Sequence, residues 1–219
     1  STNWQAIIRQ QRSITMWLVL TVLAVWGAGP LYPFLMLPLG VAVIASYSAC
    51  RTLLSAMNLV VQSVSSYLPT KARLILEQEG KEAFRKHMLR TCSQSLLLGF
   101  IFLLALHLFA EPLLHFFYGG RYDHAAPVMR ILAYGTVCSL VVVVFGAYAL
   151  AMEDPRSCFL ANLGATAVTF SIGLWLIRDF GIRGAAIAAS LSAATSMIVQ
   201  ALFVVRRYCS LPFGDPCAR

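Results

Sequence analysis

The chain of 219 residues is 59% apolar and 12% charged, with a mean hydropathy of +0.74. A typical soluble domain carries about 25% charged residues. A water-soluble fold could not hide so much apolar surface from water, so it is excluded, and lipid must surround most of the surface of the protein. The net charge of +8 does not indicate nucleic acid, because most of the cations stand at the ends of apolar stretches.

Six apolar stretches follow one another, each close to or above the ~20 residues that a helix needs to cross a bilayer. They cover residues 14–37, 40–68, 92–114, 126–152, 157–177 and 183–205. The strict polar and apolar alternation of membrane strands is absent from the sequence. We therefore predict an all-α integral membrane protein, a six-transmembrane-helix bundle over 14–208 between a polar segment 1–13 and a tail 209–219.

The outer half of the first stretch is rich in residues that interrupt helices, namely Gly27, Gly29, Pro30, Pro33 and Pro38. Proline removes a backbone donor and clashes with the preceding turn, so a kinked or broken helix is expected. Broken membrane helices are tolerated where they meet protein or a water-filled cavity. The alternative is a plain helix that ends at Pro30 and continues as an external loop.

Arg51 lies about eleven residues into the second stretch, or on the order of 16 Å below its outer end at the helical rise. An arginine at that depth costs about 2.5 kcal/mol, so it should face a wet cavity or a partner. Its planar guanidinium suits phosphate oxygens. Tyr47, Ser48 and Ser55 share its face at spacings of three or four, and these four residues are the candidate substrate-binding group. The alternatives are that Arg51 snorkels or pairs outside this chain, and that the serines only pack.

Two further residues are secondary candidates. His107 lies inside the third stretch, where a hydrogen-bonded packing role is the alternative. Arg130 lies one turn inside the fourth stretch, where interfacial anchoring is the alternative. The stretch HFFYGGRYDHAAPVMRILA (115–133), which contains Arg130, interrupts the apolar pattern and predicts a turn between two helices.

Motifs for catalysis are missing: the sequence has no nucleotide-binding loop, no HExxH, no GxSxG and no paired carboxylates. The six cysteines form no CxxC, and the four histidines lack ligand spacing. We therefore expect no enzyme activity, no metal and no cofactor.

The distribution of lysine and arginine predicts that both termini face the cytoplasm. Twelve cations fall in one set of connections and three in the other: Arg9, Arg12, Lys71, Arg73, Lys81, Arg85, Lys86, Arg90, Arg156, Arg206, Arg207 and Arg219 against Arg121, Arg178 and Arg183. The charged loop 69–91, with a break at Gly80, is expected to form a short amphipathic helix at the cytoplasmic interface. Its cations fix topology, or alternatively bind a partner or lipid headgroups.

Several motifs carry a family resemblance through their order: LGVAVIASYSACRTLL, SSYLPTKARLILEQEG, HFFYGGRYDHAAPVMRILA, ALAMEDPR and FGIRGAAIAASLSA. Over 14–208 the chain resembles the C-terminal lobe of the polysaccharide (O-antigen and exopolysaccharide) flippases, within the multidrug/oligosaccharidyl-lipid/polysaccharide exporter superfamily. That family's fold has two six-helix lobes around a central cavity, which implies that this chain is one lobe and that an N-terminal lobe of the same protein is its partner.

The resemblance also implies a function. It is that of a multi-pass flippase of the bacterial inner membrane, which moves an undecaprenyl-diphosphate-linked oligosaccharide outward by alternating access for lipopolysaccharide or exopolysaccharide biosynthesis. Arg51 takes the role of holding the diphosphate head, while membrane lipids surround the tail. Three alternatives stay open: a multidrug/cation antiporter of the same superfamily, which would favour acidic cavity residues; a membrane enzyme of glycan assembly, which would carry a large external loop; and a partial lobe that transports nothing.

Overall fold

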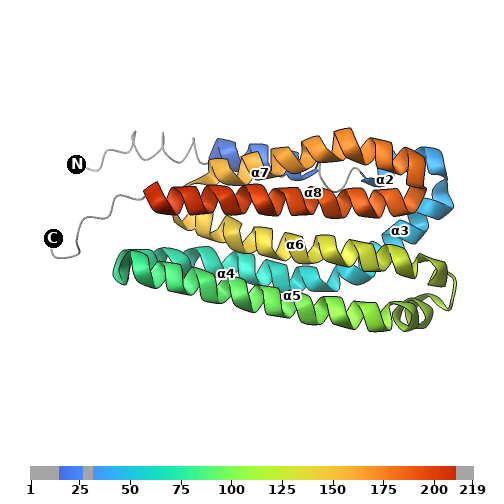
Figure 1. Ribbon diagram of the computed structural model, residues 1–219, viewed down its shortest axis with the longest axis horizontal. Coiled ribbons are helices and arrows are strands. Elements are labelled where there is room, and N and C mark those ends of the chain that lie inside the picture. The colour runs from blue at the N-terminus through green and yellow to red at the C-terminus, as the bar shows by residue number, and fades with distance from the viewer. Residues whose placement is uncertain (1–14, 27–31, 211–219) are drawn as a thin grey trace.

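The computed structural model describes residues 15–26 and 32–210, and over these residues the chain is helical and contains no strand (Figure 1). Its elements are a helix Thr15–Trp26, α2 (Tyr32–Leu35), the 3-10 helix η1 (Leu37–Leu39), α3 (Val41–Leu54), α4 (Ala56–Gln78), α5 (Gly80–Tyr118), the 3-10 helix η2 (Asp123–Ala125), α6 (Ala126–Ala151), α7 (Pro155–Val168), the π-helical turn η3 (Thr169–Gly173) and α8 (Leu174–Ser210). The prediction of an all-α chain is confirmed for this part of the sequence.

Three helical segments are long and apolar enough to cross a membrane: Gly80–Tyr118, Asp123–Ala151 and Pro155–Ser210. The pair α3 and α4 makes a fourth if it counts as one broken span, with a bend of 40° between its halves. Large apolar side chains such as Phe100, Leu104 and Leu108 on α5 point outward. Lipid, rather than water, is the solvent that such a surface requires, so the chain is a membrane protein.

The segment Pro155–Ser210 folds back on itself at Gly181, which has φ 56° and ψ −129° inside α8. After this kink the chain returns along α7, so that Gly164 lies beside Thr195 and Val199. Gly184 sits so close to the carbonyl of Leu176 that a Cβ at this position would collide with it. Glycine therefore makes both the turn and the close crossing possible.

Helix α6 lies at the centre of the bundle, between α8, α5 and α4 (Figure 1). One cluster of buried residues, around Tyr47, Leu114 and Met129, joins it to α3 and α5. A second cluster, around Phe84 and Tyr148, joins it to α4, α5 and the last turns of α8. The two clusters lie toward opposite ends of α6 and leave its middle to the site described below.

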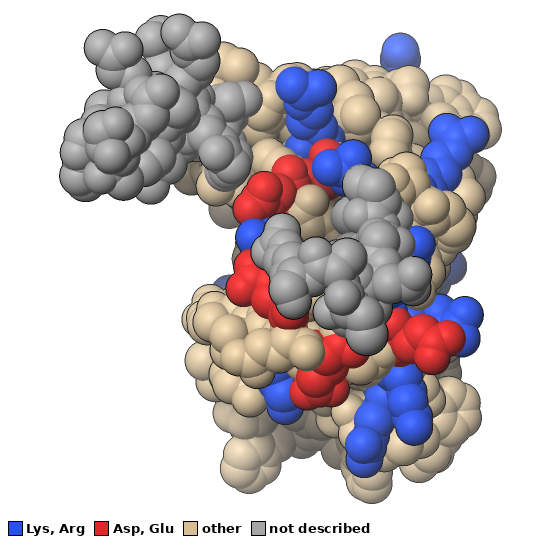
Figure 2. Space-filling model, turned by 90° about the vertical axis from the view of Figure 1, so that its left-hand side faces the viewer, with Lys and Arg blue, Asp and Glu red and all other residues tan. Residues whose placement is uncertain are grey.

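Charged side chains gather at the end of the bundle formed by the α4–α5 turn, the α6–α7 turn and the last turn of α8 (Figure 2). We call it the charged end. The opposite end carries the start of α3, the α5–α6 turn and the kink at Gly181 (Figure 1).

The short interfacial helix expected over 69–91 is not a separate element. Helix α4 continues through Pro69 to Gln78, and α5 begins at Gly80, whose φ of 86° makes the turn between them. The physical reason is packing: Ala72, Leu76 and Phe84 are buried against α6 and α8, so the apolar face meets protein rather than the lipid surface.

Candidate functional site

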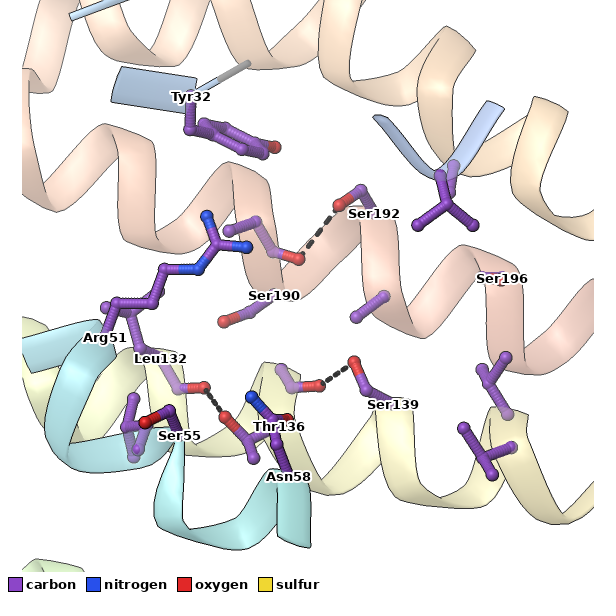
Figure 3. Close-up of a pocket in the computed structure, with 18 of the residues that line it drawn as sticks. Tyr32, Arg51, Ser55, Asn58, Leu132, Thr136, Ser139, Ser190, Ser192 and Ser196 are labelled. Carbon is purple, nitrogen blue, oxygen red and sulfur yellow. Dashed lines mark hydrogen bonds between the residues drawn. The ribbon is translucent and has the colours of Figure 1, made fainter. Parts of the chain in front are cut away.

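A cavity of about 430 Å³ opens along the middle of α6, between α3, α4, α7 and α8 (Figure 3). We call it the central cavity. Its polar lining residues are Tyr32, Tyr47, Arg51, Ser55, Asn58, Thr136, Ser139, Asn162, Ser190, Ser192 and Ser196. This volume lies within the range of ~300–1,000 Å³ that is typical of small-ligand sites.

The break between α3 and α4 supplies one wall of the central cavity. Arg51 lies in the last turn of α3, Ser55 forms the bend, and Asn58 lies in the first turn of α4. The backbone stays hydrogen-bonded through the bend, because the Ser55 N–H donates to the carbonyls of Arg51 (3.0 Å) and Thr52 (3.1 Å). The guanidinium of Arg51 extends from this wall across the cavity toward α8 (Figure 3).

Four hydroxyl groups on the α6 and α8 walls donate their protons to helix carbonyls. Thr136 donates to Leu132 (3.1 Å), Ser139 to Gly135 (2.9 Å), Ser190 to Ile131 (2.8 Å) and Ser192 to Ala189 (2.9 Å). Each hydroxyl has one proton, so what remains is acceptor capacity on oxygen. The walls therefore offer hydrogen-bond acceptors, and the guanidinium of Arg51 offers donors.

The electrostatic character of the central cavity follows from its lining. Among the described residues that line it, Arg51 is the cation and no aspartate or glutamate is present. The hydroxyl of Ser196 is buried and has no hydrogen-bond partner within the described part of the chain. A site of this kind, walled by apolar helices, favours an anion that also carries hydroxyl groups.

Three of the four residues that the sequence predicts to form the site come together here: Arg51, Tyr47 and Ser55. Tyr47 is 2% exposed, and its ring lies 6.4 Å from that of Tyr32. The Tyr32 hydroxyl is 3.2 Å from that of Thr169 in η3, so the aromatic pair forms a firm wall at the α2 side. Ser48 is half-buried and does not line the cavity.

The two secondary candidates lie outside the central cavity, on the surface shared by α5 and α6. Arg130 donates to Glu111 across 3.1 Å. The imidazole of His107 lies 3.4 Å from the Tyr134 hydroxyl and 3.1 Å from the carbonyl of Leu103.

Sequence reasoning missed the contribution of α6, α7 and α8 to this site. The small residues of GAAIAASLSAATS are typical of close helix packing, yet Ser190, Ser192 and Ser196 among them line the cavity. The one signal in the sequence is the spacing of four between Ser192 and Ser196, which a packed helix face also shows, and Ser190 does not share it.

The described residues contain no group of three or more histidine, cysteine or acidic side chains placed to hold a metal ion. Comparison of the chain with protein families, with curated proteins and with solved structures finds no match.

Proposed function

We propose that this chain is the C-terminal lobe of a polysaccharide flippase, which carries an undecaprenyl-diphosphate-linked oligosaccharide from the cytoplasmic to the outer leaflet of the bacterial inner membrane. The observation that carries this proposal is Arg51, placed in a cavity whose described lining holds no acid and several hydroxyl acceptors. The two lobes enclose the site together and expose it alternately to either side.

The chemistry of the central cavity matches the head of such a lipid in two respects. A diphosphate is a compact anion, and a guanidinium binds phosphate oxygens through charge-assisted, often bidentate hydrogen bonds. Sugar hydroxyls are good donors, and the oxygens of Thr136, Ser139 and Ser192 remain as acceptors. A cation antiporter would need an acid to hold its cation, and the described lining supplies none.

The proposal includes a topology of six spans with both termini in the cytoplasm. Its first span contains Thr15–Trp26, its second is the broken pair α3 and α4, and the kink at Gly181 separates the fifth from the sixth. The gathering of lysine and arginine at the charged end (Figure 2) supports a cytoplasmic position for that end.

The test is translocation of a lipid-diphosphate oligosaccharide in proteoliposomes that contain both lobes. We expect Arg51→Gln to slow translocation at least about tenfold, since one charge-assisted hydrogen bond contributes roughly 1.5–3 kcal/mol. Arg51→Lys should retain part of the rate, because it keeps the charge and loses the planar fork. Arg178→Gln, a change of the same kind outside the central cavity, is the matched control.

Equal rates for the parent and Arg51→Gln would contradict the role of Arg51. Efflux of a cationic dye without movement of the lipid would indicate the antiporter instead.

A further inference from the structure

A second cavity, of about 630 Å³, lies at the opposite end of the bundle and has a cationic rim. We call it the end cavity. It is bounded by the first turns of α3, by the turn that precedes α6, by the start of α6, and by α8 just after its kink. Arg121, His124 and Arg183 line it, and no acid is among its described lining residues.

The cations of the end cavity stand out against their surroundings. The connections at this end carry three arginines, Arg121, Arg178 and Arg183, and two of the three line this one cavity. Within the described residues neither Arg121 nor Arg183 forms an ion pair with an acid. In the same turn, Oδ2 of Asp123 lies 3.0 Å from Nδ1 of His115, while Oδ1 is buried with no hydrogen-bond partner among the described residues. The described lining of the end cavity is therefore cationic, with two arginines and a histidine and no aspartate or glutamate.

The rim of the end cavity is held in place by contacts to α3. The Tyr118 hydroxyl donates to the carbonyl of Ala49 (3.4 Å), and Nε2 of His124 lies 3.4 Å from the hydroxyl of Ser46. Ser46 already donates to the carbonyl of Ala42, so it accepts from His124. These contacts fix the turn around Arg121 against α3 before any ligand arrives.

Aliphatic side chains also line the end cavity: Val128 is buried, Val43 and Ile182 are half-buried, and Val41 is exposed at the edge, as are the cations of the rim. A site with guanidinium groups at its rim and aliphatic side chains in its lining suits an amphiphile whose phosphate meets the cations and whose hydrocarbon meets the aliphatic side chains. In the proposed topology this end lies at the outer leaflet, where phosphate headgroups are found.

We propose that the end cavity binds the phosphate of a lipid through Arg121 and Arg183. Two sources share this chemistry: a phospholipid of the bilayer, and a lipid phosphate that the protein carries. Helices α3, α6 and α8 line both cavities, and Ser46 of the end cavity is followed directly by Tyr47 of the central cavity. The inference does not depend on transport, because phosphate binding at this end is measurable in the resting protein.

The test measures equilibrium binding of lipid and phosphate probes to the purified protein in a non-ionic detergent by microscale thermophoresis. The probes are dioctanoyl phosphatidylglycerol, farnesyl diphosphate, inorganic diphosphate and the phosphate-free dioctanoylglycerol. All variants are made in an Arg51→Gln background, so that the central cavity and the proposed function do not contribute to the signal. We expect R121Q/R183Q to weaken binding of the phosphate amphiphiles by about tenfold or more, the scale expected for charge-assisted hydrogen bonds. Arg178→Gln should change it less than about twofold.

Each outcome decides the proposal. Tighter binding of phosphatidylglycerol than of farnesyl diphosphate identifies a bilayer phospholipid, and the reverse identifies the carried lipid. The inference is overturned if R121Q/R183Q binds like the parent, if dioctanoylglycerol binds as tightly as the phosphate amphiphiles, if inorganic diphosphate alone binds as tightly as they do, or if no phosphate amphiphile binds. Loss of binding in Arg178→Gln as well would also overturn it, since a diffuse charge effect would then suffice.

Discussion

Arg73 Nη1 lies 2.7 Å from Oε1 of Glu153, and this ion pair joins the end of α4 to the turn between α6 and α7. The same guanidinium contacts Glu77 on α4 and the carbonyl of Ala151. Glu153 itself has a φ of 55°, a left-handed backbone conformation that a non-glycine residue adopts at a cost.

The turn at Glu153 predicts an unusual order of stability among variants. Glu153→Ala loses the ion pair and keeps the left-handed strain, while Glu153→Gly loses the pair but relieves the strain. Relief of the left-handed strain stabilises the folded glycine variant by roughly 1–2 kcal/mol, but the greater backbone freedom of glycine also stabilises its unfolded state and offsets part of this gain. We therefore expect the glycine variant to be more stable than the alanine variant by about 1 kcal/mol. Thermal unfolding in detergent measures this, and an alanine variant as stable as the glycine variant would contradict it.

The close crossing at Gly184 predicts that a single methyl group disturbs the hairpin of α7 and α8. Gly184→Ala drives Cβ into the backbone of Leu176, which cannot rotate away, so we expect a loss of at least about 2 kcal/mol. Gly146→Ala is the control, because the nearest atom to its new Cβ would be Cys158 Sγ at 3.9 Å. That control should be neutral or slightly stabilising in a helix. Equal unfolding temperatures for both variants would refute the close crossing.

The hydrogen bonds of the buried Tyr148 side chain to two half-buried partners predict the effect of removing its phenol oxygen. The Tyr148 hydroxyl lies 2.7 Å from Nδ1 of His87 and donates to Thr91 across 3.1 Å, and Tyr148 is fully buried. Tyr148→Phe leaves both partners short of a bond, so we expect a loss of about 1–3 kcal/mol in the free energy of unfolding. Tyr134→Phe removes a longer, exposed contact and should cost less than about 0.5 kcal/mol. Denaturation of the two variants side by side would show whether burial decides the cost.

A wet central cavity predicts a pattern of thiol reactivity. In a background with the native cysteines replaced by alanine, Asn58→Cys should react with a water-soluble maleimide, because Asn58 lines the cavity. Leu104→Cys on the exposed apolar face of α5 should not react, since lipid covers that face and a thiolate does not form in hydrocarbon. Equal labelling of both positions in membranes would show that Asn58 is no more accessible to water than Leu104, and would contradict a water-filled central cavity.

The sequence was sufficient to predict a helical membrane protein and the positions of its apolar stretches. These depend only on properties along the chain, namely the length of each apolar run and the places where charged residues interrupt it. The turns at Gly80 and after HFFYGG were readable for the same reason. Arg51 could be singled out because an arginine deep in an apolar run is costly wherever that run packs.

The composition of the site was decided by tertiary structure. Tyr47 and Ser48 both lie within one turn of Arg51, but adjacent residues diverge by about 100° around a helix, and packing of α3 turned one into the cavity and the other away. Serines on α8 serve close packing or a cavity wall equally well, so only the position of α6 opposite them decides the role of Ser190 and Ser192. The arginines of the end cavity meet for the same reason: 62 positions separate Arg121 from Arg183 in the sequence (183 minus 121), and a kink at Gly181 and a turn pinned to α3 bring them to one rim. The sequence determines the chemical character of each side chain, but the packing of the helices determines which side chains line the same cavity.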